Sequence, residues 1–443
     1  MLKTLRNALK IEDIRNRLKY TLLMLIVIRL GSLLPLPGVD PTVITNFFNT
    51  MAGSGGPMTN MLDMLTGGAF ERMSIFALSI SPYITSSIIM QLLTIAIPKL
   101  EEMQKDGEEG RKKIQQLTRY VTVALALIEA LAMSIGFGQQ GLFENFNFVN
   151  VSIAVVALTA GSAFLMWIGE SITEKGVGNG ISIILLVNIV SRIPTDFITL
   201  YDRFMKGKKI SMAVLAVAII IVVILLTVVL VLILNGGERK IPVQYAKKMQ
   251  GRKMVGGQST HIPLKVNTAG VIPIIFTSSI MSFPSVIAAF LGKDPMVETG
   301  FGYRIIRVLN QQNWFNMQHP RRTIGLLIYL VLVVFFSYFY TSITFNPIEV
   351  ADNMKKQGGF VPGIRPGKPT TEHLTRILNY IIFIGAAGLI FVAIVPIFFN
   401  GMFGAMVSFG GTSIIIIVGV ILETMKQIES LMLVRYYKGF LND

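Results

Sequence analysis

The chain has 443 residues, of which 52% are hydrophobic and only 15% are charged, whereas a soluble domain is usually about 25% charged. This composition excludes an ordinary soluble protein and indicates an integral membrane protein with many spans, which are helical because lipid cannot satisfy free backbone groups. The net charge of +15 is typical of Lys and Arg gathered on the cytoplasmic side of a membrane protein, and the lack of cysteine excludes thiol catalysis, disulfides and cysteine-ligated metals.

The N-terminal residues 1–19 are basic and amphipathic, and an apolar run follows them without an A-x-A cleavage site. We therefore expect a retained first helix rather than a removed signal. Further apolar runs of about spanning length follow along the chain. The ten predicted spans are 18–36, 73–97, 117–138, 151–170, 180–200, 211–235, 269–291, 323–345, 374–397 and 404–424.

The distribution of Lys and Arg predicts the orientation of these spans. With the N-terminus inside, the inside segments carry 28 of the 40 basic residues and the outside segments carry 11, while Arg29 lies within the first span. Cytoplasmic segments of membrane proteins are enriched in Lys and Arg. We therefore expect both termini to face the cytoplasm.

Four segments outside the apolar runs have patterns of their own. Residues 37–72 form a long outside segment, and its stretch near 58–68 is too short to span, so we predict a half-helix folded back toward the protein. The sequence GVGNG at 176–180 predicts a tight turn. Residues 236–268 are typical of a basic cytoplasmic hairpin, and residues 346–372 predict a second cytoplasmic loop, rich in glycine and proline.

Two similar strings occur about 190 residues apart, PYITSSIIM at 82–90 and PIIFTSSIM at 273–281. Aligning their prolines pairs Ile84 with Ile275, although the TSSI blocks are then one residue out of register. The strings lie in the second and seventh spans, which are the second members of two halves of five. Because five is odd, the halves have opposite topology, which is the layout of an inverted repeat with a functional path at its interface.

Polar residues within the spans have structural and functional explanations. Small Ser and Thr residues let membrane helices approach closely and bond across. Arg29 either snorkels to the interface or lines a cavity. Glu129 lies in the middle of the third span, where an ionisable residue indicates a functional site by default. No chain of acidic and His residues crosses the other spans, however, and this counts against an ion-coupled transporter. His261, His319 and His373 lie far apart in sequence, outside any metal-binding pattern.

Six stretches, spread over the whole chain, carry a further pattern. They are ALSISPYITSSIIMQLL (77–93), GVGNGISI (176–183), GGERKIPVQYAKK (236–248), IPLKVNTAGVIP (262–273), ADNMKKQGGFVPGIRPG (351–367) and FGGTSIIIIV (409–418). Together they resemble the SecY family of protein-conducting channels, and the full loop at 351–367 resembles its bacterial branch.

The resemblance implies an all-α polytopic membrane protein with ten transmembrane helices in two inverted five-helix halves around an hourglass pore. The halves would be residues 1–200 and 211–424, and residues 425–443 would be a cytoplasmic tail. A ring of bulky aliphatic side chains would close the pore, since a narrow aliphatic constriction resists ion flow by dewetting. The ring residues would be Ile80 and Ile84 from the second span, Ile181 and Leu185 from the fifth, Ile275 from the seventh and Ile416 from the tenth.

The resemblance also implies a plug and a lateral gate. The half-helix near 58–68 would close the outside vestibule as a plug formed by Asn60, Met61, Leu62, Met64, Leu65, Thr66 and Gly67. The pore would open sideways between spans 2 and 3 on one side and spans 7 and 8 on the other, where small polar faces hold helices together weakly. The gate residues would be Ser86, Ser87, Gln91, Glu129, Asn267, Thr277 and Ser278. At Glu129 the chain departs from the family pattern, in which an uncharged polar residue, often Gln, is expected.

The cytoplasmic loops would dock the SecA motor and the ribosome, including ribosomal RNA, through salt-dependent contacts. The docking residues would be Arg239, Lys247, Lys248, Arg252, Lys253 and Arg365. Other implied partners are SecE- and SecG-like small membrane subunits, signal sequences, nascent chains and membrane lipid. The resemblance implies no cofactor, metal or catalytic residue, and the chain has no G-x-x-x-x-G-K-[ST] motif for nucleotide binding.

The implied function is that of the central pore subunit of the general secretory translocon in the plasma (inner) membrane. Such a passive, gated channel passes unfolded polypeptides across the membrane and releases transmembrane segments sideways into lipid. The alternative is an inverted-repeat secondary transporter for a small solute, which would need a compact set of polar midplane residues where the implied ring is aliphatic. A third class, an intramembrane enzyme, would need a GxSG or paired-Asp motif, and the spans contain neither.

Overall fold

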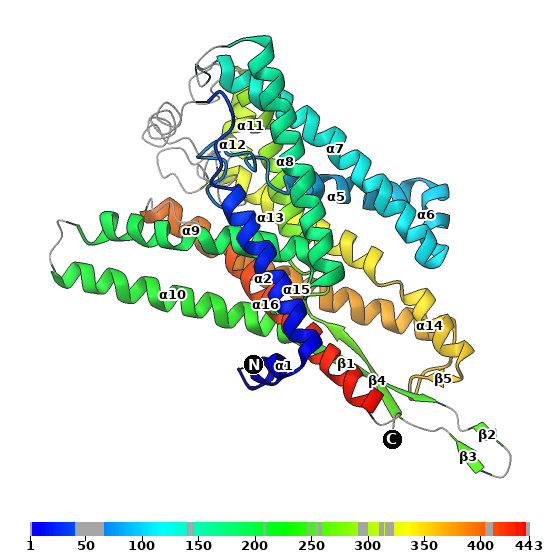
Figure 1. Cartoon of the computed structure of the whole chain (residues 1–443). Coiled ribbons are helices and arrows are strands. Elements are labelled where there is room, and N and C mark those ends of the chain that lie inside the picture. The colour runs from blue at the N-terminus through cyan, green and yellow to red at the C-terminus, as the bar shows by residue number, and fades with distance from the viewer. Residues whose placement is uncertain are drawn as a thin grey trace.

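The computed structural model is a bundle of long helices with a small β-sheet at one end (Figure 1). It describes residues 2–39, 66–139, 141, 143, 146–206, 210–245, 248–250, 253–255, 259–290, 300–309, 314, 323–403 and 411–439. Helix α1 and the end of α16 lie at the same end of the bundle as the sheet.

Ten long helices of the described residues each overlap one predicted span. They are α2 (Glu12–Gly31), α5 (Ser81–Ala96), α7 (Gly107–Gln139), α8 (Phe148–Lys175), α9 (Gly180–Phe204), α10 (Ile210–Gly236), α11 (Ile272–Phe290), α13 (Ile324–Thr344), α15 (Lys368–Phe403) and α16 (Gly411–Gly439). Shorter helices are α1 (Leu2–Lys10), α6 (Pro98–Lys105), α12 (Phe301–Leu309) and α14 (Pro347–Lys356).

Length and hydropathy identify six of these helices as long and apolar enough to cross a membrane: α7, α8, α9, α10, α13 and α15, which runs on from Lys368. Helices α5 and α6 pass the same test as a pair, but the pair is bent by 101°. Helix α2 carries Arg15, Arg17 and Lys19 before its apolar half begins, which lowers its hydropathy. The ten-span count is therefore consistent with the described helices, although some of them combine charged and apolar halves.

The second predicted span, 73–97, is wrong at its start, because residues 67–80 form turns and a single bridge, and α5 begins only at Ser81. Met73 and Ser79 have positive φ angles of 45° and 51°. A non-glycine residue in this conformation lies outside the right-handed helical region, so the helix cannot extend back through either residue. The apolar composition of the segment masked this break.

The two prolines of the repeat have equivalent places in the structure. Pro82 is the second residue of α5, and Pro273 is the second residue of α11. Proline is tolerated in the first turn of a helix, where its missing N–H would have no partner in any case. Ile84 and Ile275 are consequently the fourth residues of their helices, which preserves the pairing predicted from the sequence.

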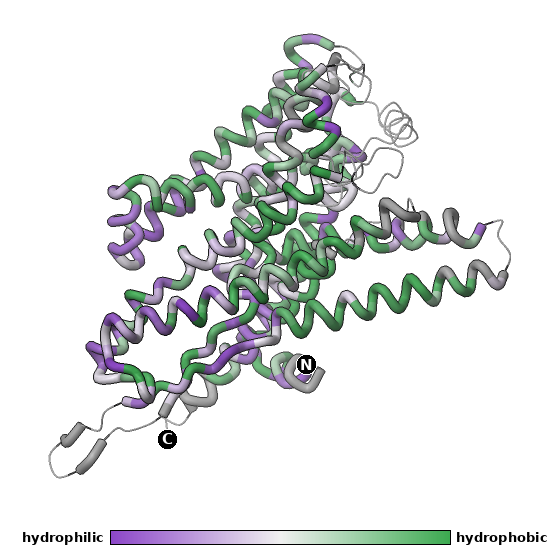
Figure 2. Tube along the Cα trace, turned by 180° about the vertical axis from the view of Figure 1, so that it is seen from behind, coloured by the Kyte–Doolittle hydropathy of each residue, from purple (hydrophilic) through white to green (hydrophobic). Residues whose placement is uncertain are grey.

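Apolar side chains pack in several clusters, of which the central one joins both ends of the sequence. This central cluster combines α2, α8, α9 and α16 with residues just before α5, and α11 packs against it. One further cluster lies within the first half, around α7 and α8, and another within the second half, around α10, α13 and α15. Figure 2 shows hydrophobic residues along the helices and hydrophilic residues gathered around α6 and the sheet.

The sheet joins the two predicted cytoplasmic loops. Strand β1 (Glu238–Tyr245) pairs antiparallel with β4 (Ser259–Lys265) on one edge and with β5 (Gly359–Phe360) on the other. Strands β2 (Lys248–Gln250) and β3 (Lys253–Val255) form the predicted hairpin tip. A Cβ on Gly359 would lie 2.8 Å from Cγ of Met354 and 2.9 Å from Cε1 of Tyr245, so a larger residue would force these side chains to shift where the loops meet.

Candidate pore and lateral gate

The six predicted ring residues lie together in the central cluster. Ile80, Leu185 and Ile416 are buried there, with exposed fractions of 1%, 6% and 3%. Ile84, Ile181 and Ile275 are half-buried and pack against the same cluster. The structure thus brings side chains from α5, α9, α11 and α16, and from the turn before α5, into one aliphatic group, which we call the collar.

The cluster also contains aliphatic residues that the sequence analysis did not single out. They are buried neighbours on the same helices, such as Ile183, Ile189 and Val420, and residues of α8, such as Leu165 and Ile168. No signal in the sequence separates them from the ring residues, because every one is an aliphatic residue in an apolar span. They form the packed surround of the collar.

Predicted gate residues of α5 and α11 bond within helix pairs. The Ser86 hydroxyl donates to the carbonyl of Thr118 in α7 at 2.7 Å, so it joins α5 to α7. Thr277 donates to the Pro273 carbonyl of its own helix, and Ser278 shares a hydrogen bond with the Tyr329 hydroxyl of α13. Span 2 is thus tied to span 3, and span 7 to span 8. Of the other predicted gate residues on α5, Ser87 and Gln91 are half-buried.

The predicted seam between these two pairs runs where α7 contacts α11. Glu129, on α7, is half-buried. Asn267 is buried just before α11, and its Nδ2 donates to Oδ1 of Asn235 in α10 at 2.8 Å. The structure therefore places Asn267 against a helix of its own half, and its role at the gate stays a prediction.

Only the end of the predicted plug falls within the described residues. Asn60, Met61, Leu62, Met64 and Leu65 lie outside them.

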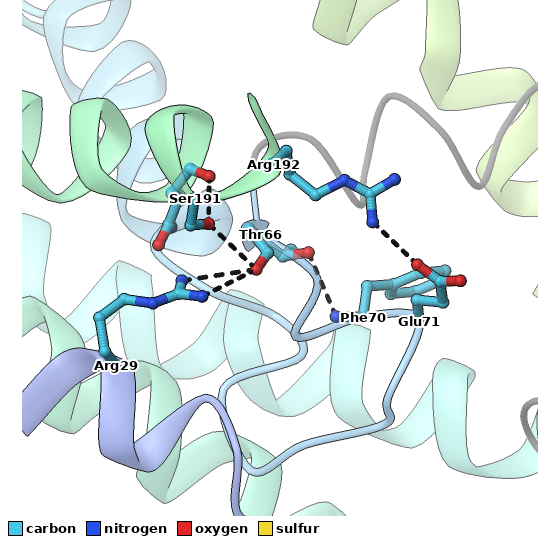
Figure 3. A network of polar contacts seen from close by, with 8 residues as sticks. Arg29, Thr66, Phe70, Glu71, Ser191 and Arg192 are labelled. Atoms are coloured by element: carbon cyan, nitrogen blue, oxygen red, sulfur yellow. Dashed lines mark hydrogen bonds and ion pairs between the residues drawn. The ribbon is translucent and has the colours of Figure 1, made fainter. Parts of the chain in front are cut away.

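Thr66 and Gly67 are described, and both are buried. The Gly67 carbonyl accepts hydrogen bonds from both terminal nitrogens of Arg29, each at 3.4 Å, and from the Ser191 hydroxyl at 3.3 Å (Figure 3). Arg29 therefore points into the protein rather than snorkelling outward.

Four of the predicted docking residues fall within the described residues, in or near the two cytoplasmic loops. Arg239 on β1 and Arg365, in the loop before α15, are exposed. Lys248 and Lys253 lie on the strands of the hairpin tip. Lys247 and Arg252 lie outside the described residues.

Two observations on the described residues bear on a metal site and on a solute site. These residues contain no group of three or more His, Asp or Glu residues that could hold a metal ion. A cavity of about 250 Å³ lies between α9 and α10, and its lining is apolar, from Phe197 and Leu200 on α9 to Ile224 and Leu225 on α10. A solute site would be expected to combine apolar walls with a few placed polar groups.

Comparison with known proteins decides the family of the chain. The SecY family model matches residues 74–425. The chain belongs to the SecY family. It is 44% identical over 448 residues to the protein translocase subunit SecY of Halalkalibacterium halodurans and 43% identical over 451 residues to that of Bacillus subtilis, and each match covers 100% of both chains. The resemblance to bacterial SecY is thereby confirmed.

Solved structures of SecY relatives share the fold. A protein-conducting channel has a TM-score of 0.62 at 18% identity, and the match covers 94% of this chain and 92% of the other. Sec61 in the canine ribosome–channel complex has a TM-score of 0.60 at 17% identity, with the same coverage. The predicted fold of an all-α membrane channel is confirmed, and none of these matches supports the small-solute transporter.

Proposed function

We propose that this chain is the pore subunit of the general secretory translocon, a passive and gated channel for unfolded polypeptides. The observation that carries the proposal is the collar, which draws aliphatic side chains from both halves of a SecY-family chain into one group. A narrow aliphatic constriction resists ion flow by dewetting. Because it makes no specific bonds, it also yields to a passing chain of any sequence.

The division of polar and apolar contacts supports sideways release into lipid. The halves meet through apolar packing, in the central cluster and in a second cluster where Ala8, Ile14 and Val177 contact Met425 and Ile428. Several hydrogen bonds between different segments instead join partners within one half. In the first half these are Tyr20–Ser171, Ser86–Thr118 and Arg119–Glu170, and in the second they are Asn267–Asn235, Ser278–Tyr329 and Tyr338–Asn379.

Such an arrangement lets the halves part at the α7–α11 contact while each stays intact. A signal sequence or transmembrane segment would replace apolar contacts of the seam and then enter lipid. Hydrogen bonds between membrane helices average only about 0.6 kcal/mol, so the hydroxyls on these faces do not lock the seam. Ser86, Ser87, Gln91, Glu129, Thr277 and Ser278 would border the path.

The basic sheet end is the proposed docking surface. One sheet joins β1, which carries the exposed Arg239, to β5, which precedes the exposed Arg365 by five residues, and basic residues on such joined loops suit ribosomal RNA and the SecA motor. The Sec61 relative comes from a ribosome–channel complex, which supports the ribosome as a partner. SecE- and SecG-like subunits complete the proposed complex in the plasma membrane, with both termini in the cytoplasm.

Site-specific crosslinking tests the channel function. Photoreactive residues at Ile84 and Ile275 should crosslink to a secretory chain stalled in translocation, because both side chains belong to the collar. The same probe at Leu226, an exposed residue of α10 away from the collar, should not. If neither collar position meets the stalled chain while small solutes compete for transport, the channel function fails.

A further inference from the structure

Helix α9 carries two kinds of residues along one face. Ile181 and Leu185 belong to the collar and lie near the start of the helix, whereas Asn188 and Arg192 follow toward its other end. The spacing i, i+4, i+7 and i+11 places all four on one side of a helix. Ser191 lies beside this stripe. The polar part of the stripe contacts residues 66–80, the segment that leads into α5 and the collar.

The contact nearest the collar is a buried hydrogen bond. Asn188 Nδ2 donates to the Ser79 hydroxyl at 3.2 Å, and the two residues are 3% and 2% exposed. The Ser162 hydroxyl of α8 donates to the Ser79 carbonyl at 3.1 Å. With φ at 51°, Ser79 is in a conformation that persists only when its surroundings fix it. Ile80, the next residue, is a collar residue.

Three more contacts, from Arg29, Ser191 and Arg192, hold the start of the segment, as Figure 3 shows. Arg29 donates to the Gly67 carbonyl, and Arg192 pairs with Glu71 at 2.8 Å. The Ser191 hydroxyl is shared between the Asn188 carbonyl of its own helix at 2.7 Å and the Gly67 carbonyl at 3.3 Å. Gly67 has φ at 66°, and a Cβ there would lie 2.8 Å from Cα of Asn188. Only glycine combines this backbone conformation with so close an approach to α9.

We propose that Asn188, Ser191 and Arg192 form a clamp, which holds residues 66–80 against α9 and so keeps Ile80 in the closed collar. The clamp is polar and fixes position, while the collar is apolar and excludes water. A polypeptide that displaces Ile80 from α9 breaks the clamp's bonds, so the clamp favours the closed channel. This inference rests on the proposed function, because it takes the collar as the barrier to ions.

Resting ion conductance of the full-length protein in planar bilayers, with no substrate present, tests the clamp. Asn188→Leu and Ser79→Ala each remove the same hydrogen bond. Each should raise the conductance by about 2- to 12-fold, the factor that corresponds to a net hydrogen-bond contribution of about 0.5–1.5 kcal/mol. The conductance of the double variant should rise by less than the product of the two single effects, since the single variants lose one shared bond. Ser191→Ala removes the hydroxyl shared between the Gly67 and Asn188 carbonyls, so its conductance should rise less, and it provides a separate test of the clamp if either variant fails to reach the membrane.

Two references make the result decisive. Ser152→Ala in α8 removes a hydroxyl that, among the described residues, bonds the Phe148 carbonyl of its own helix, so it should leave the conductance unchanged. Ile84→Asn wets the collar and should raise the conductance whether or not the clamp exists.

If Ile84→Asn conducts while the clamp variants do not, or if the effects of Asn188→Leu and Ser79→Ala simply multiply, the clamp is refuted and the channel function stands. If Ile84→Asn leaves the conductance at the resting level, the proposed function fails and the clamp fails with it.

Discussion

Two glycines determine how closely α9 approaches α8, and therefore where Ile181 and Leu185 enter the collar. A Cβ on Gly180 would lie 1.9 Å from the carbonyl oxygen of Gly169. A Cβ on Gly169 would lie 2.5 Å from Cδ1 of Ile181. A methyl group on Gly180 would meet the backbone of α8, and one on Gly169 would displace the end of the Ile181 side chain. The position of these collar residues therefore depends on glycines outside the collar.

Gly180→Ala should destabilise the protein by about 1–3 kcal/mol, because the new methyl group meets backbone on α8 that cannot move aside. It should also raise resting conductance, since α9 must shift and carries two collar residues. Thermal unfolding in detergent and bilayer conductance check both effects. Gly302→Ala in α12, where a Cβ meets nothing within 4 Å, is the matched control. Wild-type stability of the Gly180 variant would contradict this account.

Among single residues, some members of the collar could be predicted from the sequence and others could not. The repeat paired Ile84 with Ile275, because a proline marks the same helical position twice, and the family resemblance then assigned both to the ring. Ile181 and Ile416 followed only from the family resemblance, since an isoleucine in an apolar span has no distinguishing neighbour. The hydrogen bond between Ser79 and Asn188 could not be predicted, because it joins residues 109 apart through a left-handed serine.

Among the elements, the long helices could be predicted from the sequence, whereas only part of the sheet could be predicted. Long apolar runs located the ten helices, and partial alternation with a turn indicated the hairpin of β1 and β4. The pairing of β1 with β5 was missed, because β5 has two residues and lies more than 100 positions along the chain. That pairing, with the packing of Met354 and Val361 on β1, unites loops that the sequence presents as separate.

Because the two cytoplasmic loops form one sheet, Arg365→Glu should change the proposed docking surface. The Arg365 side chain is exposed, so the substitution should leave assembly intact, while the reversed charge should weaken contact with ribosomal RNA or an acidic motor surface. Ribosome binding measured over a range of salt concentrations should show lower affinity and a slope reduced by about 1. Arg304→Glu, an exposed charge on α12, is the control at the opposite end of the bundle. Unchanged export and binding by the Arg365 variant would refute the docking role.

For the whole molecule, the odd number of spans in each half predicted an inverted pair, and the clusters show how such halves would hold together. Each half has apolar packing of its own, around α7 and α8 in the first and around α13 and α15 in the second. The central cluster and the contact of α16 with α9 join the halves. The arrangement of halves in space could not follow from the sequence pattern alone, since apolar faces carry no information about their partner.

Cutting the chain between residues 206 and 210, after α9 and before α10, tests whether this packing suffices to join the halves. The two fragments, expressed together, should copurify and support export, because the intact link contributes mainly effective concentration, on the order of mM, while the central cluster supplies the contact. A cut between Leu185 and Asn188 should abolish both, since it separates the α9 collar residues from the clamp and breaks a helix that both halves contact. Fragments from the first cut that insert into the membrane but do not copurify would show that the halves depend on their covalent link.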